Sequence, residues 1–417
     1  MKRFFSVGVS ALWRDSSVLF LGMVVVYVLN FGFQVYMGRV LLPHEYAQLV
    51  SLLSFFNILL IPLGMVSLSV NRMVRLMVLK DMERSLGVIF IQWLRRLVFF
   101  GVFLGILFIF FRKSFSAYIP TTSLAWVVLF VSGLLVISLR PVVDGMILGL
   151  QDFGRFTLLN ILCWATRLLV AFLCVQWLTT STFAGVLGHV VGFGVSVIVG
   201  CIWVSKWYVK RTAENFELPQ TNKFSFISVL VLLGYSVLMT ADVILVKRFY
   251  PDEAGAFAYA ATLGRLIIFI PQALIGAMFP KVVAVEEETR EHRVLFYYSA
   301  GATLLLTSLG AITLYPIAEF LLVWIFGLEG DVNIAVGLCR KLSIAMVPIA
   351  MLNVMSRYLL AQSRWLEVLC IPIAAVVYVM ATVIYVDSVD QLVMMIGIVG
   401  LVTAGLLAVM LIARPVK

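Results

Sequence analysis

Charged residues are scarce in this sequence. Of its 417 residues, 12% are Asp, Glu, Lys or Arg and 63% are hydrophobic, so the charged share is about half that of an ordinary soluble domain. Water cannot be the solvent for most of such a surface, and lipid must take its place. A bilayer core of about 30 Å needs about 20 apolar residues per helical crossing, and runs of that length recur from Val18 to the C-terminus.

Motifs of enzymes, metal sites and cofactor sites are also missing. The five cysteines lie inside apolar stretches without C-x-x-C spacing, which is typical of small buried hydrophobic side chains rather than of disulfides or metal ligands. There is no D-x-D, no paired histidines and no nucleotide-binding glycine loop. We therefore predict a protein that is not an enzyme and has no catalytic residues, no metal and no cofactor.

The predicted membrane topology explains the net charge of +10, so this charge does not indicate a nucleic-acid partner. If both termini are cytoplasmic, most of the 31 Lys and Arg fall on the cytoplasmic side, including Arg357 at the end of the tenth span, as the positive-inside rule requires of an even number of crossings. Lys2 and Arg3 before the first apolar run resemble a signal peptide, but no small-x-small cleavage site follows, so we expect a retained first helix. The twelve predicted spans are residues 16–38, 46–70, 87–111, 122–148, 156–178, 183–206, 224–247, 256–280, 294–325, 334–360, 365–386 and 389–412.

The two halves of the chain resemble each other. Residues 208–223 form the most polar stretch, and we interpret them as a cytoplasmic linker between six-helix halves at 1–207 and 224–417. Repeated halves of equal orientation are typical of transporters that rock about a central cavity, although apolar helices also match one another by chance. The repeated landmarks, at offsets of 208, 209 and 211 residues, are Pro43 and Pro251, Pro62 and Pro271, and Gln151 and Gln362.

Four segments carry a resemblance to a known family. They are Gly38-Arg39-Val40-Leu41-Leu42-Pro43-His44-Glu45-Tyr46, Asp242-Val243-Ile244-Leu245-Val246, the run from Ala254 through Tyr259 to Arg265, and Phe279-Pro280-Lys281-Val282. With them the chain resembles the polysaccharide-flippase branch, which includes the O-antigen flippases, of the multidrug/oligosaccharidyl-lipid/polysaccharide (MOP) exporter superfamily. The resemblance implies an all-α integral membrane protein with twelve transmembrane helices in two six-helix bundles, arranged in a V as in MATE transporters.

The same resemblance implies a function. We expect a protein of the bacterial inner membrane that moves an undecaprenyl-diphosphate-linked oligosaccharide, such as an O-antigen unit, from the cytoplasmic to the outer leaflet. The expected partners are this substrate, membrane lipids and a glycan polymerase, with no nucleic acid, and we expect a monomer. Lipid II flippases of the superfamily usually carry two further helices, whereas multidrug exporters also have twelve.

Arg265 and Asp242 are the first candidates for a functional site. An ionisable group inside the bilayer is costly unless it is paired or hydrated, so each one points to a binding site or an ion path. The planar guanidinium of Arg265 suits a diphosphate because it donates two hydrogen bonds at once and stays charged. A structural ion pair between Arg265 and Asp242 is the alternative, and Asp242 is also a candidate for coupling transport to an ion.

Five further residues complete the candidate site. Arg167, at mid-depth in the fifth span with no acid within a turn, needs a tertiary partner or a ligand. Arg72 and Arg75 share a face at the predicted cytoplasmic end of the second span and either capture the diphosphate or reach for lipid phosphate. Lys247, near the outer end of the seventh span, is a candidate for substrate release. His189 is a candidate for ion coupling, with helix packing beside Gly188 and Gly192 as the alternative.

Two other functions remain open. A cation-coupled multidrug exporter needs acids and aromatic rings in its cavity, whereas the spans here hold more basic than acidic side chains, which favours an anion. An integral membrane polymerase or glycosyltransferase needs a large polar loop, and the longest one here is the linker. Arg140 and Asp144, four residues apart, are expected to form a pair within one helix.

Overall fold

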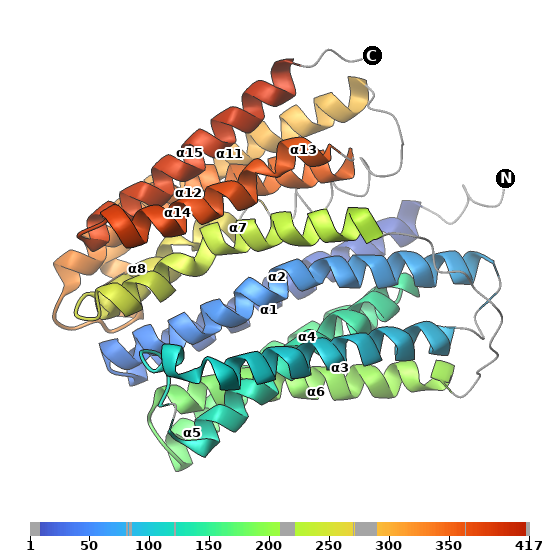
Figure 1. The fold of residues 1–417 in the computed structure, drawn as a ribbon, viewed down its shortest axis with the longest axis horizontal. Helices are drawn as coiled ribbons and strands as arrows, with labels where there is room; N and C mark the ends of the chain where they lie inside the picture. The colour runs from blue at the N-terminus through green and yellow to red at the C-terminus, as the bar shows by residue number, and fades with distance from the viewer. Residues whose placement is uncertain are drawn as a thin grey trace. The chain divides into compact units, whose positions relative to one another are not determined.

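The computed structural model is an all-helical chain in its described part, which covers residues 9–80, 82, 86–120, 122–208, 222–269, 271, 290–362 and 364–413. Eleven of its helices are long and apolar enough to cross a membrane, and Ala254–Phe269 is a shorter apolar segment. The elements (Figure 1) are α1 (Val9–Val40), α2 (Pro43–Leu79), α3 (Leu86–Phe110), η2 (Arg112–Phe115), α4 (Leu124–Gly149), α5 (Phe153–Trp177), α6 (Thr182–Tyr208), α7 (Asn222–Phe249), α8 (Ala254–Gly264), α9 (Leu266–Phe269), α11 (Arg290–Phe320), η3 (Leu321–Ile325), α12 (Val332–Ala361), α13 (Trp365–Val368), α14 (Cys370–Tyr385) and α15 (Val389–Ala413).

Local sequence signals explain several helix ends. Pro43 begins α2, where its missing N–H costs nothing, and the Glu45 carboxylate accepts a hydrogen bond from the Leu42 N–H at 3.3 Å. The end of α4 is set by Gln151, which adopts a φ of 57° in the left-handed conformation that closes helices. Asp152 then caps α5 by accepting from the Arg155 N–H at 3.0 Å.

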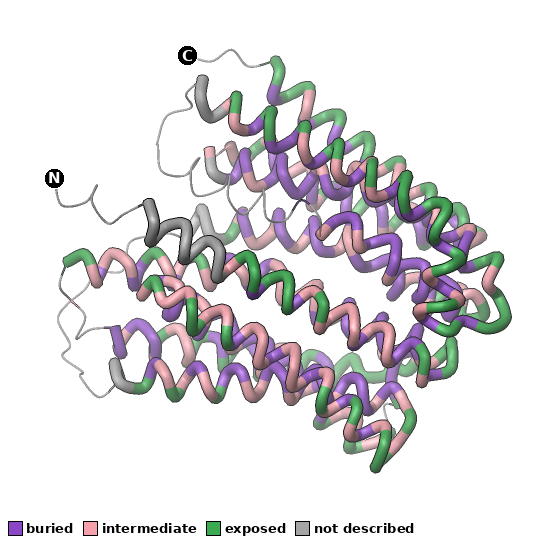
Figure 2. The backbone as a smooth tube through the Cα atoms, turned by 180° about the vertical axis from the view of Figure 1, so that it is seen from behind, coloured by how far each residue is buried: buried purple, intermediate pink, exposed green. Residues whose placement is uncertain are grey.

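The outer faces of the helices are apolar. Figure 2 shows exposed positions running along one side of many helices while the other side is buried. On α15 the exposed positions carry large hydrophobic side chains, which lipid solvates and water does not. These side chains are Met394, Ile398, Leu401, Val402, Leu406, Val409, Met410 and Ile412. The apolar exterior and the eleven long helices together make this a multi-pass membrane protein.

The contacts divide the chain into two units. Unit 1 contains Met1–Met37 and Leu63–Thr221, and unit 2 contains Gly38–Pro62 and Asn222–Lys417. The predicted division kept all of α2 in the first half, whereas its first part, up to Pro62, groups with the second unit. The predicted linker at 208–223 lies mostly outside the described residues.

Unit 1 is built on close helix packing. α5 packs against α6, α4 against α6 and α3 against α4 (Figure 1). Glycines allow this approach, because a Cβ at Gly145 of α4 would lie 2.6 Å from the Ser67 carbonyl oxygen of α2. A Cβ at Gly192 of α6 would lie 2.5 Å from the Cys163 carbonyl oxygen of α5. Small residues at such contacts replace the hydrophobic driving force that lipid removes.

Unit 2 is organised around α12. This helix packs against α8, α11 and α15 and also contacts α7 and α9, while α14 packs against α7. The predicted span 256–280 is wrong as a continuous helix in its described part, because α8 ends at Gly264 and Arg265 lies between α8 and α9. Its residues 270 and 272–280 lie outside the described residues, as does the segment Phe279–Val282 of the family resemblance.

Candidate functional site

The first part of the candidate site is a buried ion pair in unit 2. Asp242 on α7 is 0% exposed and Arg265 is 8% exposed. Nη2 of Arg265 donates a hydrogen bond to Oδ1 of Asp242, and the Val243 N–H donates to the same oxygen at 2.9 Å. The structure therefore contains the ion pair that the sequence left open. Pairing lowers the cost of placing either charge in this interior.

This pair does not use all of its hydrogen-bonding capacity. Oδ2 of Asp242 and Nε of Arg265 are buried and have no hydrogen-bond partner among the described residues. The Tyr378 hydroxyl and Oγ1 of Thr382, both on α14, are also buried, and Tyr378 interacts electrostatically with both members of the pair. Buried polar atoms are normally bonded, so the ion pair keeps unused hydrogen-bonding capacity in the interior of unit 2.

The second part of the site is Arg167 in unit 1, which is 2% exposed. Its Nη1 donates to the Asn30 side-chain oxygen at 3.2 Å, and its guanidinium lies 3.7 Å from the ring centre of Phe33 and 4.9 Å from that of Trp164. A ring face attracts a cation without neutralising it. The tertiary contacts of Arg167 thus include an amide and two rings.

His189 lies beside Arg167. It is 3% exposed, its ring centre is 4.8 Å from that of Phe193, and it interacts electrostatically with Arg167. The neighbouring Gly188 brings α6 against α5, because a Cβ there would lie 2.6 Å from the Arg167 carbonyl oxygen. Helix packing accounts for this placement, and ion coupling by His189 stays a prediction.

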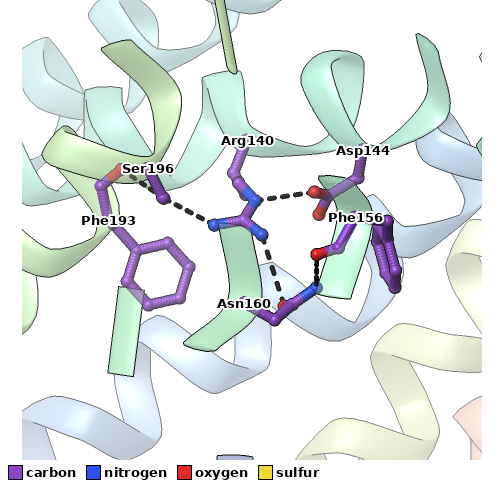
Figure 3. A network of polar contacts seen from close by, with 6 residues as sticks. All are labelled: Arg140, Asp144, Phe156, Asn160, Phe193 and Ser196. Atoms are coloured by element: carbon purple, nitrogen blue, oxygen red, sulfur yellow. Dashed lines mark hydrogen bonds and ion pairs between the residues drawn. The ribbon is translucent and has the colours of Figure 1, made fainter. Parts of the chain in front are cut away.

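Arg140 belongs to a separate network that ties α4, α5 and α6 together (Figure 3). Nε donates to Asp144 at 2.8 Å, Nη1 donates to Ser196, and Nη2 donates to Asn160 at 3.3 Å. The predicted pair four residues apart is confirmed. Because every guanidinium nitrogen has a partner, we interpret this network as structural.

The three remaining predicted residues lie apart from these clusters. Arg72 is exposed and Arg75 is half-buried, and the prediction that they end the second helix is wrong, because α2 continues to Leu79. They stand about two turns and one turn inside its end. Lys247 on α7 is half-buried and its Nζ donates to the His44 carbonyl at 3.2 Å. Its role in substrate release stays a prediction.

Sequence reasoning missed one arginine. Arg357 was grouped with the cytoplasmic loops, but it lies within α12, where Nε donates to the Asn353 side-chain oxygen at 3.0 Å. The guanidinium interacts electrostatically with Tyr235 of α7. The available signal was its position before the apolar residues Tyr358, Leu359 and Leu360.

The segment Gly38–Tyr46 has a structural role that its sequence did not reveal. Gly38 is needed because a Cβ there would lie 2.7 Å from the Phe326 ring, and its carbonyl accepts from the Tyr259 hydroxyl at 2.7 Å. Tyr46 stacks on Tyr259 with ring centres 4.4 Å apart and bonds Thr262 at 2.9 Å. The segment therefore anchors the α1–α2 turn to α8 within unit 2.

Arg39 in this segment caps another helix, which gives a stability prediction. Its Nε donates to the Ile325 carbonyl at 2.7 Å and its Nη2 to the Trp324 carbonyl, at the negative end of η3. We expect Arg39→Gln to lower stability by about 1 kcal/mol, the size of a cation's interaction with a helix C-terminus, measured as a lower thermal midpoint in detergent. Arg72→Gln, at an exposed arginine about two turns before the end of α2, is the control. Equal shifts in the two variants would contradict the capping role.

Among the described residues, no three His, Cys, Asp or Glu side chains come together as a metal site. The described candidates are a buried ion pair in unit 2 and, separately, a buried arginine in unit 1 that bonds Asn30. A guanidinium has the donor geometry for phosphate oxygens.

Comparison with known proteins identifies the fold. No protein-family model matches the chain, and no curated protein matches it by sequence. Among solved structures, the lipid II flippase MurJ in an inward closed conformation has a TM-score of 0.72 at 11% identity, covering 95% of this chain and 88% of that one.

Two multidrug resistance MATE family transporters of the MOP superfamily are also similar. The inward-facing one has a TM-score of 0.71 at 14% identity and covers 91% of this chain and 92% of its own. The outward-facing one has a TM-score of 0.68 at 15% identity, with 94% and 92% covered. The chain therefore has the all-helical fold of the MATE and MOP transporters.

Proposed function

We propose that this protein is a flippase that moves a polyprenyl-diphosphate-linked oligosaccharide, an O-antigen or other surface-glycan unit, from the cytoplasmic to the outer leaflet of a bacterial inner membrane. The fold it shares with MurJ, described as a lipid II flippase, supports transport of a lipid-linked substrate. Both termini are proposed to be cytoplasmic, and a glycan polymerase is the proposed consumer of the product.

The observation that carries the proposal is the balance of charge inside the helices. Asp242 and Asp144 are each paired with an arginine, so a cationic drug has to displace that arginine before it can bind either carboxylate. Arg167 is a buried cation whose contacts include Asn30 and two aromatic rings. A buried guanidinium attracts an anion, and a diphosphate offers the oxygens that a guanidinium fork fits.

The Asp242–Arg265 pair supplies a way to couple binding to movement. A diphosphate that accepts hydrogen bonds from Arg265 competes for the guanidinium with the Asp242 carboxylate, whose Oδ2 is already without a partner among the described residues. Binding energy is then converted into a change of contacts between α7 and the α8–α9 junction. A ligand shifts a conformational equilibrium only by such differential contacts.

The experiment is flux in proteoliposomes with two cargoes, a polyprenyl-diphosphate oligosaccharide and a lipophilic cation. We expect transport of the first, and we expect Arg167→Gln to reduce it roughly tenfold because hydrogen bonds to a charged group are worth about 1.5–3 kcal/mol. Arg155→Gln is the matched control on the same helix, since Arg155 is an exposed arginine paired with Asp152, and its flux should not change.

The second candidate is a cation-coupled multidrug exporter, which the likeness to multidrug resistance MATE transporters favours. It predicts the opposite selectivity in the same assay. Transport of the cation without the lipid-linked glycan would establish the exporter and exclude the flippase.

A further inference from the structure

Arg357 is a cation that the site described above does not use. It is half-buried on α12, and Nε, bonded to Asn353 at 3.0 Å, is its one nitrogen with a hydrogen-bond partner among the described residues. No carboxylate of the described residues pairs with it. An arginine within a membrane-spanning helix that lacks a carboxylate partner indicates a functional contact.

Tyr235 on the neighbouring helix α7 also has unused hydrogen-bonding capacity. Tyr235 of α7 is 4% exposed, and its hydroxyl is buried without a hydrogen-bond partner among the described residues. The hydroxyl and the Arg357 guanidinium interact electrostatically. α7 and α12 are in contact, so the charged donor on one helix and the hydroxyl on the other can bind one acceptor together.

The orientation of Arg357 argues against simple contact with lipid headgroups. A snorkelling arginine near a helix end extends toward that end, whereas Arg357, about one turn before the end of α12, bonds Asn353, which lies one turn further from that end. Tyr235 lies near the middle of the apolar segment Phe226–Phe249. The guanidinium therefore points toward the interior of unit 2.

This position is aligned with the Asp242–Arg265 pair. Tyr235 and Asp242 are seven residues apart on α7, which places them on one face about 10 Å apart along the axis. Gly264, next to Arg265, packs against Leu342 of α12, fifteen residues before Arg357. Tyr235 precedes Asp242 on α7, and Arg357 follows Leu342 on α12. Both residues thus lie on the same side of the Asp242–Arg265 pair, toward the N-terminal end of α7.

We propose that Arg357 and Tyr235 form a second subsite that binds the phosphate-bearing group of the substrate before it reaches Arg265. This inference rests on the proposed function and extends it: the phosphate-bearing group binds at two successive sites, first at Arg357 and Tyr235 and then at Arg265. Arg265 is buried and occupied by Asp242, so an arriving anion needs a cation that is accessible and not engaged by a carboxylate. Arg357 meets both conditions, at the end of α7 that the charge distribution predicts to be cytoplasmic.

The test is equilibrium binding of a fluorescent polyprenyl diphosphate to the full chain in nanodiscs of zwitterionic lipid. Arg357→Gln is expected to weaken binding roughly tenfold through loss of charge-assisted hydrogen bonds, and Tyr235→Phe about threefold through loss of a neutral one. Arg357→Lys should fall between wild type and Arg357→Gln, because it keeps the charge but loses the planar fork.

Arg340→Gln is the matched control on the same helix. Arg340 donates to the Tyr315 carbonyl at 2.9 Å and lies over the Tyr315 ring, so its substitution should leave binding unchanged. Thermal midpoints of all variants identify any that fail to fold. If the Arg357 variants fail to fold, binding by Tyr235→Phe, which removes only the hydroxyl oxygen, decides the test.

The outcomes separate this inference from the proposed function. If the wild type fails to bind polyprenyl diphosphate, the proposed function itself is overturned. If the wild type binds polyprenyl diphosphate and neither Arg357→Gln nor Tyr235→Phe weakens that binding, the flippase stands and the second subsite is overturned. Phosphatidylglycerol is then added to the nanodiscs. If it weakens polyprenyl diphosphate binding in the wild type alone, so that the wild type and Arg357→Gln bind equally, the site binds lipid headgroups and the substrate subsite is overturned.

Discussion

Asp242→Asn is expected to be among the most damaging single substitutions in this protein. It leaves the Arg265 guanidinium buried, at 8% exposure, without the carboxylate that neutralises it. Breaking a buried ion pair from one side costs about 3–5 kcal/mol, and we expect a corresponding fall in the thermal midpoint together with loss of lipid-linked glycan transport. Arg265→Gln should do the same from the other side, since Asp242 is fully buried.

The double variant Asp242→Asn/Arg265→Gln separates stability from transport. With both charges gone, no unpaired ion remains in the interior, so most of the lost stability should return while transport stays lost. A double-mutant cycle measures this coupling directly. If the two single effects simply add, Asp242 and Arg265 are not a coupled pair.

Asp390→Asn is the matched control for this experiment. Asp390 pairs with Lys341 at 2.7 Å, but the two side chains are 51% and 42% exposed. Exposed ion pairs contribute about 0–1 kcal/mol, so neither stability nor transport should change measurably. A large loss here would mean that the assay responds to any removed carboxylate.

Gly192→Ala is expected to disturb Arg167 through the backbone of α5. The added Cβ would lie 2.5 Å from the Cys163 carbonyl oxygen and 3.1 Å from the Arg167 Cβ, so α5 and α6 must move apart. Overpacking of this kind costs about 1–3 kcal/mol. We expect a lower thermal midpoint and reduced flux of the lipid-linked glycan, because the guanidinium moves relative to Asn30 and Phe33.

Gly194→Ala provides the comparison on the same helix. No atom lies within 4 Å of a Cβ built there, and alanine is favoured over glycine in a helix by about 1 kcal/mol. This variant should therefore be neutral or stabilising. Equal effects at Gly192 and Gly194 would show that the backbone of α6, and not its contact with α5, sets the outcome.

Much of the candidate site followed from hydropathy and spacing. Arg140 and Asp144 pair because four residues bring side chains onto one helix face. Asp242 and Arg265 were recognised because charges are rare in apolar helices. Their pairing was foreseen only as an alternative, since the partners are 23 residues apart and belong to different helices.

Other features were beyond sequence reasoning for a physical reason. The partner of Arg167 is Asn30, 137 residues away, and the carbonyls capped by Arg39 are 285 and 286 residues away. Such contacts depend on the rotation of each helix about its axis, and a uniformly apolar helix carries little information about that rotation because lipid accepts every face. Arg357 differs from these, because its position before the apolar residues Tyr358, Leu359 and Leu360 was a signal in the sequence.

By itself, the sequence determined that this chain is helical and crosses a membrane many times, because backbone groups in lipid must bond within their own segment and only helices of about 20 apolar residues achieve this here. The tertiary structure alone decided which arginines are neutralised and which keep their charge. That distinction depends on the groups that packing places within about 4 Å of each guanidinium, and it determines where an anion can bind.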